Sequence, residues 1–523
     1  MNGGAEAPPS ALSTVQSAVV QKLLVANRGE IAVRIIRAAR DAGIATVAPY
    51  SDCDRTARHV RAADEAWPLG GDRPADTYLR IDKLLDVARR SGADAVHPGY
   101  GFLAENAEFA AACTSAGLTF IGPSANAIRL MGSKTAARDA AIAAGVPVVP
   151  GTTSSLPADA PERDVLQIAA GIGYPVMIKA VAGGGGKGMR LVAAADELAS
   201  ALRAARSEAL SAFGDGAVYF ERRIPRPRHI EVQLLGDEHG TVIPFVEREC
   251  SVQRRHQKVL EETPSIAVSE SLRAAIAEAA ARIARAVAYT NAGTIEFLLG
   301  DDGKFYFLEM NTRLQVEHPI TEAVTGIDLV QWQFRLAEGA RLDIDPDAAL
   351  RPRGHAIEAR VYAEDPDLGF LPSPGRIVHL RAPSGPGIRD DGGYEPNGEV
   401  PIFYDSLVSK LIAWGANRTE AIARLQRALS EYEIAGIRTT IPFFQWLLNE
   451  HAFISGDVDT TMLDRVLASR NGTPFRLPDD NTENTAAIAA ALDLFFRSHT
   501  NGASGSAAST SAWTRTARRD ALR

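Results

Sequence analysis

The sequence predicts an α/β fold with three folded units in its 523 residues. Strand and helix patterns alternate in the first unit, 21–133, which indicates a parallel sheet. The second unit, 134–340, mixes helices with strands joined by tight turns. The third, 355–465, begins with strand patterns at 355–362 and 375–380 and ends with helices, the first of them near 418–432. The remaining segments are predicted to be a disordered leader, a Pro/Arg-rich linker and a flexible or partly helical tail: 1–20, 341–354 and 466–523.

The first unit begins with a buried strand at 22–26, and the helix after it has Ile31, Ile35 and Ala38 on its apolar face. Further strand patterns follow at 43–49, 94–98 and 118–122. The turn after the first strand has one glycine, Gly29, and lacks the spaced glycines that cradle a dinucleotide. We therefore expect a Rossmann-like parallel sheet without a dinucleotide site.

A glycine-rich loop lies between two strand patterns of the second unit, within a segment of about 150–220 that we expect to form a lid. Lys179 ends the first strand, and four successive glycines follow at 183–186. The N–H groups of such a loop can approach phosphate oxygens closely. Because Lys187 is not followed by Ser or Thr and the loop leads into a strand, it is not a Walker loop. A floppy linker is the alternative, but Lys179 and the flanking strands favour a flap over a nucleotide.

A basic run contains Arg254, Arg255, His256 and Lys258. Such runs are often solvated surface. In an acidic chain, this run is also a candidate clamp for phosphate or bicarbonate. His229, in a second basic segment, fits either a ligand contact or a satisfied structural histidine.

Two strand-like runs flank Asp302 and Gly303, and Asp-Gly between such runs is the strongest short-range signal for a β-hairpin. With these two residues as the turn, Glu296 lies directly opposite Glu309 on one face, with Cβ atoms roughly 5 Å apart. Facing carboxylates are destabilising unless a cation joins them, and Mg²⁺ with nucleotide phosphates is the usual hard ion. The alternative is a wet strand face whose glutamates point at water.

Polar side chains directly follow the hairpin at alternate positions: Asn311, Arg313, Gln315 and Glu317. If the backbone stays extended, these groups continue the carboxylate face, while Leu314 and Val316 turn away. This arrangement predicts a site for an anionic substrate.

Composition narrows the function classes. A net charge of −8 and a pI near 5.8 disfavour nucleic acid as a partner. Three separated cysteines without a CxxC pair fit a reducing cytoplasm, and they support neither a disulfide framework nor a zinc site. No apolar run approaches the ~20 residues that span a bilayer, and residues 1–20 lack the basic and apolar regions of a signal peptide. The expected protein is cytoplasmic and not bound to a membrane.

Several segments resemble, in the expected order, the biotin carboxylase component of biotin-dependent carboxylases, which belongs to the ATP-grasp superfamily. They are KLLVANRGEIAVRIIRAA, HPGYGFLAENAEFA, MGSK, GGGGKGM, ECSVQRRHQKVLEE, FLEMNTRLQVEHPITE and FYDSLVSKLI. Each segment alone is suggestive, whereas the ordered set, spanning about 20–465, is highly specific. The resemblance implies an N-terminal Rossmann-like domain, a central ATP-grasp domain with a mobile lid, and a C-terminal mixed α+β domain.

The resemblance implies nucleotide contacts at these positions: Lys134, Lys179, Gly185, Gly186, Glu221, Arg222, Arg223, Ile224, His229, Gln253 and His256. Lys134 and Lys179 would hold the ATP phosphates, and 221–224 would form the hinge at the adenine. This hinge has more arginine than the family pattern, and a proline at 225. Two Mg²⁺ or Mn²⁺ ions would be held by the carboxylate pair and the next amide: Glu296, Glu309 and Asn311.

The resemblance also implies a bicarbonate site at four positions, the last acting through its backbone: Lys258, Arg313, Gln315 and Val316. Glu317 would be the general base, and Arg360 would lie at the ureido oxygen of biotin. Arg313 would stand between the two chemical steps. The implied reaction is ATP- and bicarbonate-dependent carboxylation of biotin through carboxyphosphate, the first half-reaction of an acyl-CoA carboxylase.

Family biotinylation occurs within Met-Lys-Met, which this sequence lacks. Biotin is therefore expected on a separate carrier protein; the further expected partner is a carboxyltransferase subunit, and the expected assembly is a homodimer. Acetyl- or propionyl-CoA is the expected acceptor, as in fatty acid biosynthesis, and pyruvate is the alternative. Other readings are a different bicarbonate-activating ATP-grasp ligase and a silent ATP-binding subunit. ATPase activity that rises with biotin would distinguish a biotin carboxylase from another ATP-grasp ligase. The presence of Arg313, Gln315 and Glu317 argues against a silent subunit, which would be expected to have lost some of these groups.

Overall fold

The computed structural model describes residues 19–152, 155–156, 160–181, 189–475 and 480–500. Its contacts define a large unit that ends at Gly472 and a small unit that begins at Thr473. The predicted leader up to residue 18, the glycines 183–186 and the tail beyond 500 lie outside the described residues. No helix of the described chain is both long and apolar enough to cross a membrane.

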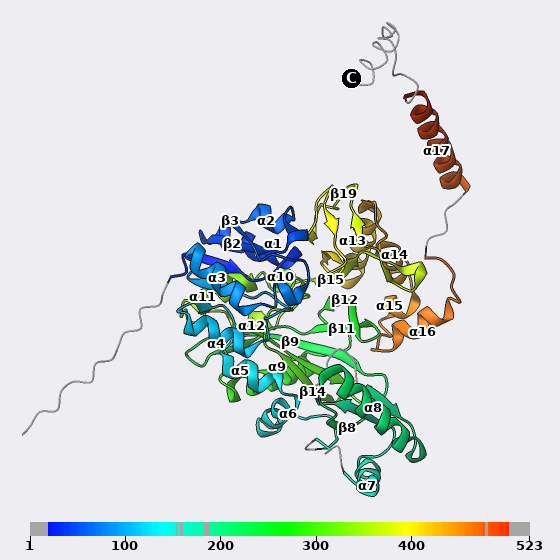
Figure 1. Cartoon of the computed structure of the whole chain (residues 1–523). Helices are drawn as coiled ribbons and strands as arrows, with labels where there is room; N and C mark the ends of the chain where they lie inside the picture. The colour runs from blue at the N-terminus through cyan, green and yellow to red at the C-terminus, as the bar shows by residue number, and fades with distance from the viewer. Residues whose placement is uncertain (1–18, 153–154, 157–159, 182–188, 476–479, 501–523) are drawn as a thin grey trace, which may run out of the picture. The chain divides into compact units, whose positions relative to one another are not determined.

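The first sheet is parallel, as predicted, and has the strand order β3-β2-β1-β4-β5. Its strands are β1 (Lys22–Val25), β2 (Ala45–Tyr50), β3 (Glu65–Pro68), β4 (Ala95–His97) and β5 (Thr119–Phe120). β3 was not predicted, because its short alternating pattern carries Pro68 and lies at the sheet edge. The helices of this part of the chain are α1 (Gly29–Asp41), α2 (Arg58–Ala62), α3 (Ile81–Ser91), α4 (Ala107–Ser115) and α5 (Ala125–Gly132). Figure 1 shows β2 and β3 of this sheet beside α1 and α2.

The second sheet has nine strands, in the order β14-β13-β9-β11-β12-β15-β22-β20, with β10 also on β9. The strands are β9 (Arg228–Gly236), β10 (Val242–Pro244), β11 (Arg248–Arg254), β12 (Gln257–Thr263), β13 (Asn291–Leu299), β14 (Phe305–Asn311), β15 (His355–Tyr362), β20 (Ile388–Gly392) and β22 (Leu407–Gly415). Because β12 pairs with β15 from Leu260↔Ala359 to Thr263↔Ala356, this sheet runs through two of the units that the sequence separates. The predicted linker at 341–354 contains a short helix, α12 (Pro346–Ala349).

A third sheet contains the two strands that flank the predicted flap in the sequence. Its strand order is β7-β6-β8, and its pairing is antiparallel. Its strands are β6 (Val176–Ala180), β7 (Met189–Val192) and β8 (Val218–Arg222). The strand predictions on both sides of the glycines are therefore confirmed. Buried side chains from this sheet pack against those of α7 (Glu162–Ile172) and α8 (Leu198–Phe213).

The β13–β14 hairpin has Glu296 opposite Glu309, as predicted, although two details of the prediction are wrong. Gly300 hydrogen-bonds Lys304, so the loop contains three residues and not two, and the strand partners next to it are shifted by one. A β-bulge after Phe297↔Phe307 leaves one extra residue, Leu308, on β14 and restores the Glu296↔Glu309 pair. Gly303 supplies the left-handed conformation, φ 74°, that such a loop requires.

The C-terminal part begins with β15, as predicted, but the predicted strand at 375–380 is divided. β18 (Gly375–Arg376) pairs with β21 (Glu399–Val400), and β19 (His379–Arg381) pairs with β23 (Glu433–Ala435). The remaining short strands are β16 (Glu364–Asp365) and β17 (Leu371–Pro372). The predicted helix near 418–432 is α13 (Arg418–Glu431).

The remaining helices are α6 (Lys134–Ala143), α9 (Glu270–Ala286), α10 (His318–Thr325), α11 (Leu329–Ala337), α14 (Ile441–Leu447), α15 (His451–Ser455), α16 (Met462–Ser469) and α17 (Asp480–Thr500). α9 buries one face against the nine-stranded sheet, where Ile276 and Ile283 belong to the same apolar cluster as Ile230 and Ile295. This packing supports the strands that carry the carboxylate pair. α17 confirms the helix predicted in the tail.

Candidate active site

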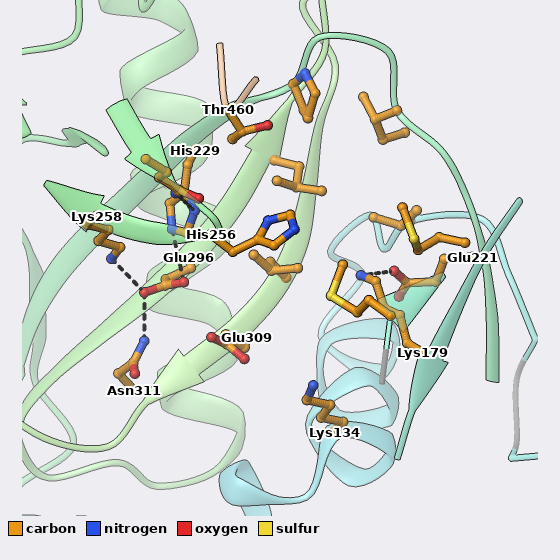
Figure 2. A pocket seen from close by; sticks show the side chains of 18 of the residues that line it. Lys134, Lys179, Glu221, His229, His256, Lys258, Glu296, Glu309, Asn311 and Thr460 are labelled. Carbon is orange, nitrogen blue, oxygen red and sulfur yellow. Dashed lines mark hydrogen bonds and ion pairs between the residues drawn. The ribbon is translucent and has the colours of Figure 1, made fainter. Parts of the chain in front are cut away.

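One cavity of about 470 Å³ brings the predicted site together (Figure 2). Every predicted site residue in the described chain lines it: Lys134, Lys179, Glu221, Arg222, Arg223, Ile224, His229, Gln253, His256, Lys258, Glu296, Glu309, Asn311, Arg313, Gln315, Val316, Glu317 and Arg360. Gly185 and Gly186 lie outside the described residues. Residues far apart in the sequence converge here because β9, β11, β12, β13 and β15 belong to one sheet.

Lys258, on β12, forms the centre of the polar network. Its Nζ contacts Glu231, and it lies 2.9 Å from Glu296 Oε1 and 2.8 Å from Glu317 Oε1. Burial lowers the pKa of Lys258, but these three carboxylates raise it well above its usual value. The ammonium is therefore charged, and its three donors hold three carboxylates that would otherwise repel each other.

Glu317 and Arg360 are joined across the cavity. Arg360 donates to Glu317 Oε2 at 2.9 Å and to Glu261 Oε1 at 2.6 Å. Burial raises the pKa of Glu317, yet Lys258, Arg360 and other nearby cations lower it well below the usual value. Glu317 is consequently a carboxylate held between two cations.

Glu296 and Glu309 face each other but have different environments. Glu296 accepts hydrogen bonds from Lys258, from Asn311 at 2.8 Å and from Gln315 at 2.9 Å. Burial raises the pKa of Glu296, whereas Lys258 and other cationic or polar neighbours lower it below its usual value. Within the described residues no hydrogen bond or ion pair reaches Glu309, and burial together with the charge of Glu296 raises its pKa. In Figure 2 Glu309 lies between Glu296 and Lys134.

The three-stranded β7-β6-β8 sheet, called the lid sheet below, brings a further cation to the cavity. Lys179, on β6, forms an ion pair with Glu221 of β8, and Arg138 of α6 lies 3.4 Å from the same carboxylate. Lys134 begins α6, and burial lowers its pKa. The two lysines thus approach the space in front of Glu309 from the side opposite the large sheet (Figure 2).

The segment after β14 does not stay extended, contrary to the prediction. The strand ends at Asn311, and Glu317 is the N-cap residue of α10. Leu314 is buried in the core, as expected, and Val316 is among the residues that line the cavity. The polar residues of this segment nevertheless line one cavity, because the turn before α10 places Glu317 next to Lys258.

The basic run 254–258 is divided between two environments. His256 and Lys258 line the cavity, whereas Arg254 stacks on Phe370, 4.2 Å from its ring centroid, and pairs with Glu364 at 3.3 Å. A single clamp of all the basic residues is therefore wrong. His229 also lines the cavity, with its Nε2 2.9 Å from Glu296 Oε2.

Sequence reasoning missed Arg248, a fully buried residue of β11. Its guanidinium donates to Glu231, which also holds Lys258, and to Gln315. Further bonds go to Gln233 and Thr321, each at 3.0 Å, and to Thr294 at 3.2 Å. No local pattern identifies such a residue, since its partners come from separate segments of the chain.

Glu105 was also missed, although it lies within a segment that carries the family resemblance. It accepts from Arg313 Nε at 3.0 Å and from the backbone N–H of Thr312 at 3.0 Å. Asn311 Oδ1 accepts from the same guanidinium at 2.8 Å. Arg313 is thereby oriented by the first sheet domain and by Asn311 at the end of β14.

Parts of the cavity wall were not expected from the sequence. Apolar side chains line it, most of them from the β7-β6-β8 sheet and the nine-stranded sheet: Val149, Met177, Met189, Leu191, Leu298 and Leu308. Thr460 and Thr461 also line the cavity, where Asp459 ties their loop to Arg226 and Arg465. An apolar wall beside a polar floor suits a ligand with a flat base and a charged tail.

Comparisons with known proteins agree with this geometry. Residues 19–128 match the model for the biotin carboxylase N-terminal domain, and residues 358–465 match the model for its C-terminal domain. Residues 133–345 match the ATP-binding domain of the carbamoyl-phosphate synthase L chain. A biotin carboxylase of a Nostoc species is 51% identical over 445 residues, which cover 85% of this chain and 99% of that protein.

The chain belongs to the biotin carboxylase family. A pyruvate carboxylase subunit of Methanothermobacter thermautotrophicus is also 51% identical, over 443 residues that cover 85% of this chain and 89% of that protein. The solved beta-gamma-ATP complex of the Campylobacter jejuni biotin carboxylase aligns with TM-score 0.82 at 43% identity, over 85% of this chain and 99% of that one. The biotin carboxylase domain dimer of a Hydrogenobacter thermophilus 2-oxoglutarate carboxylase, with MgADP and bicarbonate, gives TM-score 0.83 at 44% identity over 88% and 100%.

Family membership confirms the predicted fold class and enzyme class. A biotin carboxylase has an N-terminal domain with a parallel five-stranded sheet, a central ATP-grasp domain and a C-terminal domain. The enzyme is an ATP-dependent ligase with biotin carboxylase activity. These matches set aside two other readings, a silent ATP-binding protein and a different ATP-grasp ligase.

Proposed function

We propose that this chain is the biotin carboxylase subunit of a multi-component carboxylase, and that it uses ATP and bicarbonate to carboxylate biotin on a separate carrier protein. The observation that carries the proposal is Lys258, whose ammonium joins Glu296 to Glu317 beside Arg360. One cation thus links a carboxylate suited to metal binding with a carboxylate suited to proton transfer. We also propose the domain boundaries expected from the sequence.

The nucleotide occupies the space between the lid sheet and the large sheet. Lys134 and Lys179 supply charge for the phosphates, and the lid glycines Gly185 and Gly186 supply backbone N–H groups. The remaining nucleotide contacts come from the hinge and the facing strands: Glu221, Arg222, Arg223, Ile224, His229, Gln253 and His256. Support comes from the apolar wall beside these residues, which suits an adenine ring.

The carboxylate pair fits a divalent cation. Glu309 carries no hydrogen bond from the described residues, and its pKa is raised by burial and by Glu296, so a cation there relieves both costs. Asn311 offers an amide oxygen nearby, so these three residues would hold the ion through oxygen atoms. Mg²⁺ or Mn²⁺, in one or two sites, supplies neutralisation of the charge that develops on the transferring phosphoryl group.

Glu317 acts as the general base on bicarbonate, whose oxygen then attacks the γ-phosphorus of ATP to form carboxyphosphate and ADP. In the ligand-free site Lys258 and Arg360 make Glu317 a weak base, because they hold its pKa low. When bicarbonate binds, its own negative charge attracts the same two cations. Sharing them raises the proton affinity of Glu317 at the moment when the proton must move.

Arg313, Gln315 and the backbone of Val316 hold the bicarbonate together with Lys258. Carboxyphosphate then releases CO₂ and phosphate, and the released phosphate takes the proton from the ureido nitrogen of biotin. Arg360 stabilises the negative charge that this leaves on the ureido oxygen while the nitrogen attacks CO₂. Closure of the lid excludes water that would hydrolyse carboxyphosphate. The proposed partners are a carrier protein, a second copy of this chain and a carboxyltransferase subunit.

Acetyl- or propionyl-CoA is the proposed final acceptor, and pyruvate is the second candidate because one relative is named for pyruvate carboxylase. Proteins named for methylcrotonoyl-CoA carboxylase also align, but this chain spans only 63% of the Dictyostelium discoideum protein. Purification of the native complex, followed by identification of the biotinylated partner, would show which of these acceptors the complex carboxylates.

The activity is tested by measuring ADP release with ATP and Mg²⁺ while bicarbonate and free biotin are omitted in turn. ADP release should require bicarbonate and should rise when biotin is added. ADP release that is indifferent to both would contradict the proposed function.

A further inference from the structure

Lys410 is a fully buried lysine next to the proposed bicarbonate site. It lies on β22, directly opposite Arg360 of β15 in the sheet register. Its side chain has 0% exposure. A buried ammonium without strong partners is costly, so the groups that it contacts indicate why a lysine stands there.

The first partner is the carbonyl oxygen of Val316, 3.0 Å from Lys410 Nζ. This carbonyl belongs to the short segment between the end of β14 at Asn311 and the start of α10 at His318. A carbonyl there has no sheet or helix ladder to join, and leaving it unpaired inside the protein is unfavourable. Lys410 therefore fixes a peptide group that secondary structure does not fix.

The second partner is Glu30, in the first turn of α1, whose Oε2 lies 3.1 Å from Lys410 Nζ. Burial raises the pKa of Glu30 to about 7, and Lys410 opposes this shift. Other ionisable groups also surround the lysine: Glu358, Asp391 and His318 exert electrostatic effects with it. The ammonium is thus held from the first sheet domain while it reaches into the central one.

The peptide that Lys410 fixes lies between two side chains of the site. Gln315, on one side, contacts Glu296 and Arg248, and Glu317, on the other, contacts Lys258 and Arg360. A rotation of the Val316 peptide would displace both neighbours. Displacements of about 1 Å at a reacting group can cost ~100-fold in rate.

We propose that Lys410 is a positioning residue for the bicarbonate-binding segment 315–317, and that Glu30 only balances its buried charge. This inference rests on the proposed function, since it assigns bicarbonate to that segment. The competing explanation is that Lys410 only neutralises the buried Glu30. The two explanations differ in what happens when both charges are removed together.

The test compares the full-length chain with three variants: Lys410→Met, Glu30→Gln and the double variant. Methionine keeps most of the volume of lysine but cannot donate to Val316. Glu30→Gln leaves Lys410 its bond to Val316, so the KM for bicarbonate should stay within about twofold of wild type. The single Lys410→Met variant leaves Glu30 buried without its partner, and we expect a lower melting temperature as well as impaired bicarbonate use.

The double variant decides between the explanations. We expect a melting temperature near that of Glu30→Gln, a KM for bicarbonate raised about tenfold or more, and a KM for ATP within about twofold of wild type. Recovery of the bicarbonate KM together with the melting temperature would overturn the proposal, because neutralisation would then be the whole role. Lys83→Met is the matched control: Lys83 also donates to backbone carbonyls, of Leu69 and Asp76, but does not line the cavity.

A second measurement is independent of catalysis. Amide hydrogen exchange should rise in the segment 312–320 of the double variant, relative to Glu30→Gln, while exchange in β6 and β8 stays unchanged. Unchanged exchange in 312–320 would overturn the positioning role whether or not the enzyme turns over. Absence of bicarbonate-dependent ADP release by the wild-type protein would instead contradict the proposed function, and the exchange result would still decide whether Lys410 fixes the segment.

Discussion

Lys258 shows how a single side chain sets the chemistry of its neighbours. Three glutamate side chains share its ammonium, which offsets the repulsion that they would otherwise exert on one another inside the protein. The sequence predicted Lys258, Glu296 and Glu317 as site residues but could not show that they share one cation. Glu231, the third carboxylate, has no sequence signal, because its role depends on Arg248 and Lys258 folding around it.

Replacement of Glu317 by glutamine should remove the proposed base with little change of shape. We expect bicarbonate-dependent ADP release to fall at least about 100-fold, in line with general-base contributions. Nucleotide affinity, measured by calorimetry, should stay within about twofold of wild type. Glu317 contacts Lys258 and Arg360, and not Lys134 or Lys179, the lysines proposed to hold the phosphates.

The control for this substitution is Glu433→Gln, on an exposed glutamate that pairs with Arg381 and His379 at the surface. It should leave ADP release unchanged. Near wild-type turnover of the Glu317→Gln enzyme would remove Glu317 from the base role.

Replacement of Glu309 by glutamine should weaken metal use. Because this carboxylate lacks a hydrogen bond from the described residues, its charge is available to a cation. We expect the Mg²⁺ concentration for half-maximal ADP release to rise about tenfold or more, an effect of about 1.4 kcal/mol. An unchanged Mg²⁺ requirement would show that Glu309 does not bind the ion.

At the scale of elements, the β13–β14 hairpin shows what sequence patterns can and cannot predict. Alternation and the Asp-Gly pair predicted two strands and the Glu296↔Glu309 contact. The loop length and the bulge at Leu308 were not predicted. The third loop residue shifts the strand pairing by one position, and the extra residue of the bulge shifts it back, so the Glu296↔Glu309 pair is the same with or without both. The bulge also adds Leu308 to the cavity wall, so it contributes to the site.

The β11–β12 hairpin has a two-residue turn at Arg255 and His256, since Arg254 pairs with Gln257. Both turn residues have left-handed φ angles, 50° and 65°, a conformation that residues other than glycine, asparagine and aspartate rarely adopt. The turn is therefore less favourable than an Asn-Gly turn, and it places His256 in the cavity. Backbone strain of this kind is found where a side chain is held for function.

Arg255→Asn should relieve part of this strain, because asparagine adopts the left-handed conformation more readily. We expect stabilisation by about 0.5–1 kcal/mol, measured by urea denaturation. Arg255 is exposed and does not line the cavity, so ADP release should not change. A loss of stability would mean that the arginine side chain contributes contacts that outweigh the turn.

At the scale of the whole molecule, the sequence predicted three units but not how they share structure. Periodicity identifies β12 and β15 separately, yet their pairing joins residues on both sides of the predicted linker. Long-range pairs leave no local pattern, as Lys410 and Glu30 also show. The parallel order of the first sheet was predictable because alternating strands and helices permit few topologies.

Buried neutral histidines should make the folded protein sensitive to acid. Burial lowers the pKa of His97 from 6.5 to about 4, and its ring bonds Gln333 and the backbone N–H of Gly99. The unfolded chain binds a proton at this histidine between these two values whereas the folded chain does not, so stability falls as pH falls from 6.5 to 4.

His97→Gln removes this titration. Between pH 7.5 and pH 5 the wild type should lose about 2 kcal/mol more unfolding free energy than the variant, measured by urea denaturation at both pH values. The comparison uses the change with pH, so any constant cost of the substitution cancels. Equal losses in the two proteins would contradict a lowered pKa at His97.

The continuity of the nine-stranded sheet has a consequence for synthesis on the ribosome. When Thr263 has emerged, β12 is complete, but its neighbour β15 does not begin until His355. During that interval the nascent chain carries an open strand edge, which is a template for wrong pairing with other chains. Translation speed and chaperone capture across residues 264–354 should therefore govern the yield of this enzyme more than they would for a protein whose sheets close within each domain.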